Sequence, residues 1–441
     1  MPSSAAYKGN LVFWRDLNSS AIPLHAPSPT SPHILIIGGG VTGLTTAWTL
    51  LDHGYRVTIL SKERASYGAS QRLTSQIAGA LWEFPPAVCG QHTDAISLQH
   101  SKHWCMVAYH IWAAIAADEK LAKAAGVRMK NANFFFPVPV EEDEAQASKM
   151  REIMQSGVRG FRRSAAIITE QRVSPAFGAV DAYSLLAPII DTDACMSFLK
   201  TLVSAKGATL ITRTITGDLF HQEHALRAAF AADAILNCTG LASTDLANDP
   251  SCYPIRGALL RVLNNGTAFP KLDHALTCSP DPVRNRSDIV FLVPRNDDVL
   301  LIGGIVEPHE TSLDLTLDSP VIGRMRARCE AFLPDLKHAE LDEEYPLAQG
   351  LRPFRQRNIR VERELRVHDT DAKGRSGVSR IVHSYGHGGA GWSLCFGCAG
   401  DVLALVEEAL ADMPARTMGV DVVAVWAGEP DSFKDPARAR L

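Results

Sequence analysis

The chain has 441 residues, of which 46% are apolar and 21% are charged, and its formal net charge is −4. This length and composition predict a globular protein of about two or three domains. The absence of a long basic run argues against a nucleic-acid partner. No apolar run approaches the roughly 18 residues needed to cross a bilayer. Nine scattered cysteines predict reduced thiols in an intracellular protein, and the partner is expected to be a small molecule.

The first clear elements follow a Pro/Ser-rich linker at residues 26–32, which separates an N-terminal extension from the rest. His33–Ile37 predicts a buried strand, Val41–His53 a helix and Tyr55–Leu60 a second strand. Strand, helix and strand in this order are typical of a parallel sheet.

The later elements alternate between two patterns. Helices and parallel strands are predicted at residues 97–125, 191–205, 208–211, 234–236, 380–383 and 391–411. Between residues 255 and 304 several short strands with turn signals predict an antiparallel sheet from a second domain. The chain is therefore expected to form two interleaved domains.

A Gly-x-Gly-x-x-Gly string, Gly38 to Gly43, lies directly after the first strand and opens the first helix. In this context Gly38 permits a tight turn, Gly40 lets the backbone approach a pyrophosphate, and Gly43 lets the helix lie close to the sheet. The helix N-terminus, with Val41 and Thr42, offers free N–H groups to phosphates. The string therefore predicts a dinucleotide site.

The end of the second strand carries Ser61 and Lys62, where an acid usually binds the ribose of NAD. The missing acid argues against a simple NAD enzyme. Lys62 could bind a 2′-phosphate, as in NADP enzymes, so the glycines alone do not identify the cofactor.

The last three residues, Ala439-Arg440-Leu441, match the Ser-Lys-Leu type of peroxisomal address. We therefore expect a peroxisomal protein that binds the peroxisomal import receptor, and a cytoplasmic one otherwise. Whether the chain forms a homodimer is left open.

Several segments between residues 33 and 441 resemble the D-amino-acid oxidase family of FAD-dependent enzymes, including its yeast members. They are GYRVTILSK after the second strand, SQ with TSQIAGALW, NCTG, PIRG, GLRPFR with IRVERE, and YGHGGAGWS. The resemblance implies an α/β fold, α+β overall, in which a Rossmann-like FAD-binding domain is interleaved with a mainly antiparallel substrate domain. The residues expected to hold FAD are Gly38, Gly40, Val41, Thr42, Gly43, Ser61, Lys62, Thr74, Ser75, Gly79, Ala80, Leu81, Ile215, Gly388, Gly389, Ala390, Gly391, Trp392 and Ser393.

The family resemblance also divides the chain. It assigns residues 33–85, 190–255 and 375–415 to the FAD-binding domain. It assigns residues 86–189 and 256–374 to the substrate domain. Residues 1–32 form an extension, and residues 416–441 form a C-terminal tail.

The resemblance assigns the substrate carboxylate to the second arginine of Gly-x-Arg-Pro-x-Arg, which is Arg355. A guanidinium fits a carboxylate through two parallel hydrogen bonds and would orient the α-carbon over the flavin. The alternative is that Arg355 is a structural partner of Glu362 or Glu364. The loop at residues 385–393, with Gly389, would cover the flavin, and its backbone N–H groups would stabilise charge on the reduced ring.

Two other features of this region are weaker. His387 has no second ligand at metal-binding spacing, so no metal is expected. Cys395 and Cys398 have redox-motif spacing but lie in a predicted helix, where packed thiols are the favoured interpretation.

The expected substrate pocket departs from the family pattern. A tyrosine that shares the carboxylate is replaced by Phe291, and a second tyrosine position falls on Ser287 or Val306. Each lost hydroxyl should weaken carboxylate binding by about 1 kcal/mol or more. Glu83 is a further candidate: it could pair with a cationic group of the substrate, or act as a base with its own pKa raised by burial. The alternative is that Glu83 is a solvated loop residue.

The resemblance implies an oxidase that takes a hydride from the α-carbon of a D-amino acid. The resulting imine hydrolyses to a keto acid and ammonia, and oxygen is reduced to hydrogen peroxide. An oxidase or dehydrogenase for a secondary amine or a natural-product intermediate is the alternative that Phe291 favours. An FAD-binding protein without redox activity and an NADP dehydrogenase built on Lys62 also remain open.

Overall fold

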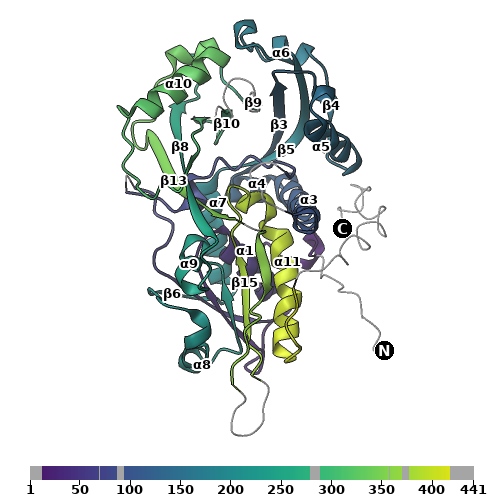
Figure 1. The fold of residues 1–441 in the computed structure, drawn as a ribbon, viewed down its shortest axis with the longest axis vertical. Helices are drawn as coiled ribbons and strands as arrows, with labels where there is room; N and C mark the ends of the chain where they lie inside the picture. The colour runs from purple at the N-terminus through teal and green to yellow at the C-terminus, as the bar shows by residue number, and fades with distance from the viewer. Residues whose placement is uncertain are drawn as a thin grey trace.

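The computed structural model describes residues 12–68, 70–86, 94–278, 289–356, 358–369 and 377–417. Two β-sheets organise this part of the chain (Figure 1). The six-stranded sheet and its helices form the lower part of the view. The nine-stranded sheet forms the upper part, with α10 beside one arm and α5 and α6 beside the other. Ser287 and Ala439-Arg440-Leu441 lie outside the described residues.

The six-stranded sheet has the order β14-β15-β7-β1-β2-β6. All neighbouring pairs are parallel except β14 with β15. In sheet order the strands are β14 (Arg360–Arg363), β15 (Ile381–Tyr385), β7 (Ala234–Asn237), β1 (His33–Ile37), β2 (Arg56–Ser61) and β6 (Thr209–Thr212).

Both faces of this sheet are buried, as its apolar strands predict. Ile34 and Ile36 pack into the main core with helices α1, α3, α7 and α11, whereas Leu35 and Ile37 pack into a second core with α8. The alternation follows from the period of two along a strand. The helices are α1 (Val41–Asp52), α3 (Ala95–Ala117), α7 (Thr192–Ala205), α8 (Leu219–Phe230) and α11 (Gly391–Leu410).

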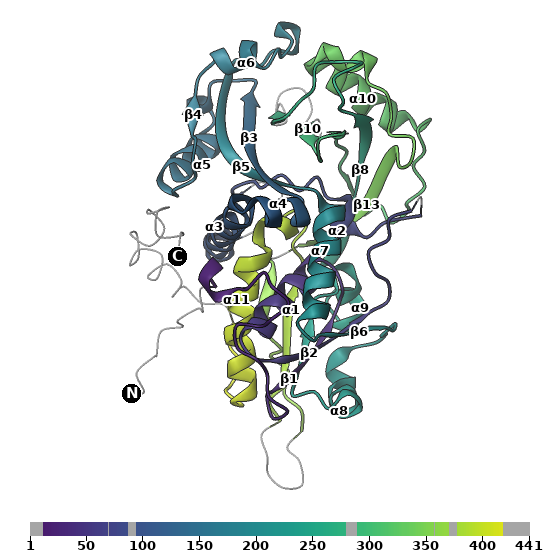
Figure 2. The same cartoon turned by 180° about the vertical axis from the view of Figure 1, so that it is seen from behind.

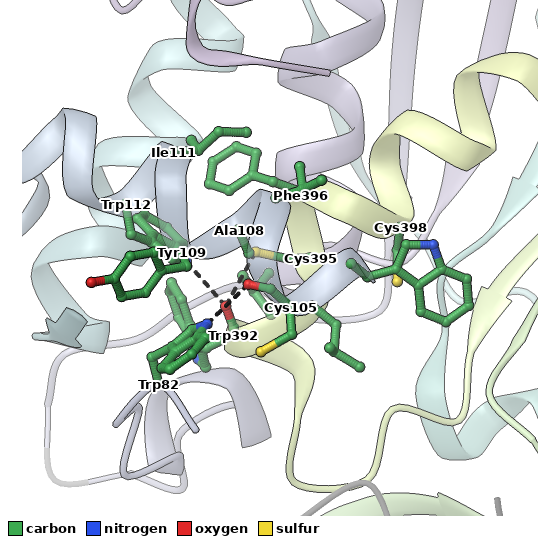
Figure 3. Close-up of a cluster of buried hydrophobic side chains, with 14 of the residues drawn as sticks. Trp82, Cys105, Ala108, Tyr109, Ile111, Trp112, Trp392, Cys395, Phe396 and Cys398 are labelled. Atoms are coloured by element: carbon green, nitrogen blue, oxygen red, sulfur yellow. Dashed lines mark hydrogen bonds between the residues drawn. The ribbon is translucent and has the colours of Figure 1, made fainter. Parts of the chain in front are cut away.

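An aromatic cluster joins α3 to α11 (Figure 3). Trp112 and Phe396 have ring centroids 4.9 Å apart, and the indole N–H of Trp112 donates to the carbonyl of Trp392 at 3.0 Å. Cys395 and Cys398 are buried in α11, in agreement with packed cysteines. Burial of such large rings is expected to hold the start of α11 in a fixed place.

The nine-stranded sheet has the order β12-β8-β11-β10-β9-β3-β5-β4, and β13 also pairs with β8. It is antiparallel except between β3 and β9. Its strands are β3 (Val127–Phe136), β4 (Arg162–Arg163), β5 (Asp181–Ile190), β8 (Cys252–Leu263), β9 (Ala275–Cys278), β10 (Val290–Pro294), β11 (Val299–Gly303), β12 (Glu307–Pro308) and β13 (Leu347–Arg355).

The two faces of this sheet differ in what covers them. Alternate residues, such as Leu260, Leu292 and Ile302, pack with α10 (Pro320–Phe332) in a core of their own. The opposite face turns toward the six-stranded sheet, and α2 (Thr74–Ile77) and α7 lie between the two sheets (Figure 2). We call this second face the site face.

The remaining elements are short. The helices are α4 (Glu119–Ala125), α5 (Glu144–Gln155), α6 (Ala166–Glu170) and α9 (Ser243–Leu246), with 3-10 helices at Trp14–Asp16, Val140–Glu142, Pro175–Phe177, Gly240–Ala242 and Pro334–His338. No helix among the described residues has the length and apolar character that a membrane span needs. The described residues also contain no cluster of three or more potential metal ligands.

The predicted fold class is confirmed, and two details differ. The helix predicted over residues 97–125 is two helices, because Asp118 ends α3 and its side chain caps α4 by accepting from the N–H of Leu121. Residues 360–363, which were assigned to the substrate domain, form β14 in the six-stranded sheet. The switch between domains therefore comes before β14, since β13 is the last strand of the larger sheet.

Candidate active site

The glycine string lies at the topological switch point of the parallel sheet, where the order of the strands reverses. Strand β1 is flanked by β2 on one side and β7 on the other, so connections leave in opposite directions at its carboxyl end. Gly38 has φ +118°, and a Cβ there would lie 2.3 Å from the carbonyl oxygen of Cys238. A Cβ at Gly43 would lie 2.0 Å from the carbonyl oxygen of Gly38. Both positions therefore require glycine, as predicted.

The N-terminus of α1 forms the phosphate-binding end of this site. Gly40 is the N-cap residue, and the nearest heavy atom to a Cβ there would be Ser75 Oγ at 3.0 Å. Ser75 Oγ accepts from the N–H of Val41 at 3.1 Å. In a helix the next N–H groups, those of Thr42 and Gly43, have no intrahelical partner. This end of α1 can therefore bind an anionic phosphate.

The end of β2 supplies the neighbouring part of the site. Ser61 is buried, and its Oγ has no hydrogen-bond partner within the described part of the chain. The same Oγ would lie 3.0 Å from a Cβ at Gly39. Lys62 is exposed, and Ile215 packs beside the core that contains Leu60. An orphaned hydroxyl at this place is consistent with a ligand that would complete its hydrogen bond.

Three chain segments meet around the helix α1 N-terminus. The Nε1–H of Trp392 donates to the carbonyl of Ser75 at 2.9 Å. The hydroxyl of Thr74 donates to the carbonyl of Leu351 at 3.2 Å, and the N–H of Gly388 donates to Pro353 at 2.8 Å. Hydrogen bonds therefore join three segments: residues 74–81, strand β13 and the loop at residues 386–391. Residues 74–81 consist of α2 and the turn after it, and we call them the loop at residues 74–81.

The last residues of the loop at 74–81 join the nine-stranded sheet. The carbonyl of Ala80 accepts from the N–H of Ile190 at 3.1 Å, and Leu81 forms a β-bridge with Ile189. On the other loop, Ala390 is the N-cap residue of α11, and the hydroxyl of Ser393 accepts from the N–H of Glu83 at 3.4 Å. Gly389, between Gly388 and Ala390, stays partly accessible.

Phe291 lies on the site face, directly opposite Gly303 on one side and Thr277 on the other. A Cβ at Gly79 would lie 2.3 Å from its ring, so the ring packs on the loop at residues 74–81. The same cross-strand row continues through Phe134 to Tyr183. Thr277 therefore places a hydroxyl-bearing side chain next to the phenylalanine.

Arg352 lies on the site face. In β13 it is paired with Ile255, and its guanidinium lies over Gly257, where a Cβ would be 2.3 Å from Nη1. Nη1 donates to the carbonyl of Ile305 at 3.2 Å and contacts that of Arg256 at 3.5 Å. Within the described ranges Arg352 makes no ion pair with a carboxylate. Burial lowers the pKa of Arg352 to about 10, which leaves it protonated at neutral pH.

Arg355 has different partners. Its Nε donates to Asp249 at 2.7 Å, and Nη1 donates to the carbonyl of Asn358 at 2.8 Å. The hydroxyl of Tyr385 also donates to Asp249, at 2.8 Å. Arg355 is three residues from Arg352 along one strand, so the two side chains leave opposite faces. The carboxylate-binding role predicted for Arg355 does not fit these contacts, because a protein acid already occupies its guanidinium.

The alternative role for Arg355 was also wrong in its partners. Glu362 pairs with Arg360, and Glu364 pairs with Arg366. Arg355 is a structural ion-pair residue, with Asp249 as the acid.

Glu83 is also paired. Its carboxylate accepts from Lys149 of α5 at 2.8 Å, and the Lys149 side chain is only 7% exposed. Glu83 is therefore an ion-pair partner of a protein lysine rather than a solvated loop residue, and its carboxylate is already engaged within the protein. Val306, the other position considered for a lost tyrosine, is exposed at the surface.

His387 is buried in the loop before α11. Burial lowers its pKa to about 4, so the ring is neutral at physiological pH. Its Nε2 has no hydrogen-bond partner among the residues that the structure describes. A second orphaned atom therefore lies in the loop that was predicted to cover the cofactor.

This geometry defines a class of protein: a dinucleotide-binding oxidoreductase whose cofactor site faces an antiparallel substrate sheet. The chain belongs to the family described as FAD-dependent oxidoreductases (DAO), whose model matches residues 33–405. FAD is accordingly its cofactor. The orphaned Ser61 and His387 atoms, the glycine turn and the free helix N-terminus fit such a group.

Relatives with curated names support this membership. A D-amino-acid oxidase of Rubrobacter xylanophilus is 29% identical over 377 residues, covering 86% of this chain and 96% of the relative. A D-amino-acid oxidase of Streptomyces coelicolor is 29% identical over 376 residues, covering 85% and 96%. Among solved structures, glycine oxidase from Bacillus cereus has a TM-score of 0.62 at 18% identity, covering 88% and 99%. This last likeness concerns the fold.

Sequence reasoning missed Arg352 and Thr277. Arg352 stood in the same motif as Arg355, and only strand alternation could have separated them. Thr277 carried no signal, because its place beside Phe291 depends on the pairing of β9 with β10.

Proposed function

We propose that the protein oxidises the α-carbon of a D-amino acid. The amino acid would lose a hydride from its α-carbon and a proton from its nitrogen, and water would convert the imine to a keto acid and ammonia. Oxygen would take the two electrons and two protons to give hydrogen peroxide. When bound, FAD supplies the two-electron acceptor for this chemistry.

The observation that carries the proposal is Arg352. It is a protonated guanidinium on the site face, beside the loop at residues 74–81, with no carboxylate partner in the described chain. A buried cation without an acid partner is costly unless a ligand completes it. A substrate carboxylate would do so through two parallel hydrogen bonds and would thereby fix the α-carbon.

The apolar row on the same face of the sheet as Arg352 supports an amino acid rather than a small polar acid. Phe291 and Phe134 would contact the substrate side chain and exclude water, and Phe291 offers no hydroxyl to the carboxylate. The names of the relatives at 29% identity support the D configuration.

A second candidate substrate is a secondary amine or a natural-product intermediate that carries a carboxylate. Phe291 favours it, because this residue offers no hydroxyl to the carboxylate of a simple amino acid.

Product analysis tests the proposal. Aerobic incubation of the purified holoenzyme with D-amino acids, L-amino acids and N-alkyl amino acids should yield keto acid, ammonia and peroxide in equal amounts from the D-amino acids. Turnover of N-alkyl amino acids alone would establish the second candidate. Peroxide without keto acid from any compound would contradict both.

We also propose a peroxisomal location, supported by Ala439-Arg440-Leu441 and by the peroxide that the proposed reaction would release. A fluorescent fusion that ends in these three residues should enter peroxisomes, and the same fusion without them should not.

A further inference from the structure

Arg295 is a buried cation that the proposed catalytic roles do not use. It directly follows β10, four residues after Phe291, and is 2% exposed. Its side chain extends from the nine-stranded sheet and binds the loop at residues 74–81, which contacts the N-terminus of α1.

Its four hydrogen bonds all go to neutral oxygens. Nη1 donates to Thr192 Oγ1 at 2.6 Å and to the carbonyl of Ile190 at 3.2 Å. Nη2 donates to the carbonyls of Ala78 at 2.8 Å and Gln76 at 3.3 Å. No carboxylate of the described residues lies within ion-pair distance of Arg295.

The guanidinium keeps its charge. Burial lowers the pKa of Arg295 to about 10, while the charges of Asp191 and Asp193 act in the opposite direction. Asp193 already pairs with Arg72 at 2.5 Å, and Asp191 binds Asn296. At neutral pH the positive charge of Arg295 is therefore only partly balanced.

The peptide between Ala78 and Gly79 connects this charge to the site. In a planar trans peptide the C=O and the N–H point in opposite directions. The Ala78 carbonyl points to Arg295, so the Gly79 N–H points away from it. Gly79 itself packs on Phe291, and its N–H donates to no other described residue. A cation on the carbonyl polarises the peptide and strengthens the N–H as a donor.

We propose that Arg295 is a positioning residue for the flavin. It fixes the loop at residues 74–81, and it favours the reduced, negatively charged cofactor by polarising the Ala78–Gly79 peptide. The residue acts through the loop rather than by touching substrate. The inference depends on FAD binding and not on which amine is oxidised.

The test compares two variants of the holoenzyme, Arg295→Met and Arg295→Lys. The midpoint potential of the flavin is measured by equilibration with a reference dye, and FAD release is measured by fluorescence. Arg295→Met should make the potential more negative and raise the Kd for FAD by about tenfold or more. The reason is that the carbonyls of Gln76 and Ala78 each lose a charged hydrogen bond, so the loop that contacts the cofactor site is held less firmly. Arg295→Lys should keep the potential near that of the unchanged protein while it still weakens FAD binding.

Arg363→Met is the matched control. Arg363 is fully buried and donates to the carbonyls of Ser379 and Met413, but it lies on edge strand β14. This variant should lower thermal stability without moving the potential.

Two results would overturn the inference. One is an unchanged potential in Arg295→Met with FAD still bound. If Arg295→Met does not retain FAD, Arg295→Lys decides: measured at saturating FAD, a clearly more negative potential in this variant shows that the positive charge is not responsible. None of these measurements uses an amino-acid substrate, so failure of the proposed substrate class would leave them intact.

Discussion

Replacement of Arg352 by methionine should remove selection for the substrate carboxylate. Arginine has five N–H donors, and two of the five contact the carbonyls of Ile305 and Arg256, which leaves three for a ligand. A carboxylate that takes two of the three would lose about 1.5–3 kcal/mol for each charged hydrogen bond. Both losses together predict a fall in kcat/KM of roughly 10²- to 10⁴-fold.

The assay is anaerobic stopped-flow reduction of the flavin by a D-amino acid and by the amine that lacks its carboxylate. The unchanged protein should strongly prefer the acid, and Arg352→Met should reduce that preference to near unity. Arg355→Met is the matched control from the same strand, and it should lower stability because Asp249 loses its partner. A carboxylate-binding role for Arg352 is contradicted if Arg352→Met keeps the preference while Arg355→Met loses it.

Three further predictions concern neighbouring groups. Phe291→Tyr should lower the KM for D-amino acids about fivefold, since one hydrogen bond contributes about 1 kcal/mol, and an unchanged KM in steady-state kinetics would count against a pocket role. Glu83→Gln should lower the thermal midpoint by weakening the contact with Lys149, with little change in kcat; a large fall in kcat would instead restore Glu83 as a catalytic base. Burial raises the pKa of Asp249, but hydrogen bonds and the charge of Arg355 outweigh it and lower this pKa to about 2. Because its folded pKa is depressed, Asp249 stabilises the fold above about pH 4 and loses this contribution as pH falls toward 2, so Asp249→Asn should flatten acid unfolding over that range.

The cofactor half of the site could be predicted from sequence because its geometry is local. Gly38 and Gly43 meet each other within one βαβ unit, so their spacing encodes the turn, whereas the contact of Gly38 with Cys238 depends on the distant strand β7. Ser61 could be predicted to lie at the cofactor site because it is the last residue of β2, and its hydroxyl has no hydrogen-bond partner within the described residues.

The substrate half could not be predicted in the same way, because its partners are distant in the chain. Arg355 and Asp249 are 106 residues apart, and Glu83 and Lys149 are 66 apart. Nothing near Arg355 in the sequence indicates that an acid already binds it. The domain boundary before β14 was missed for a related reason, since a short antiparallel edge strand carries the same pattern in either sheet.

Oxidation of a D-amino acid is tested most directly by an anaerobic titration of the purified holoenzyme with the D and L forms of one bulky apolar amino acid, followed by the oxidised-flavin absorbance. The protein should be yellow, and its absorbance band should be bleached stoichiometrically by the D form and not by the L form. Equal bleaching by both forms, or by neither while an amine without a carboxylate succeeds, would contradict this activity.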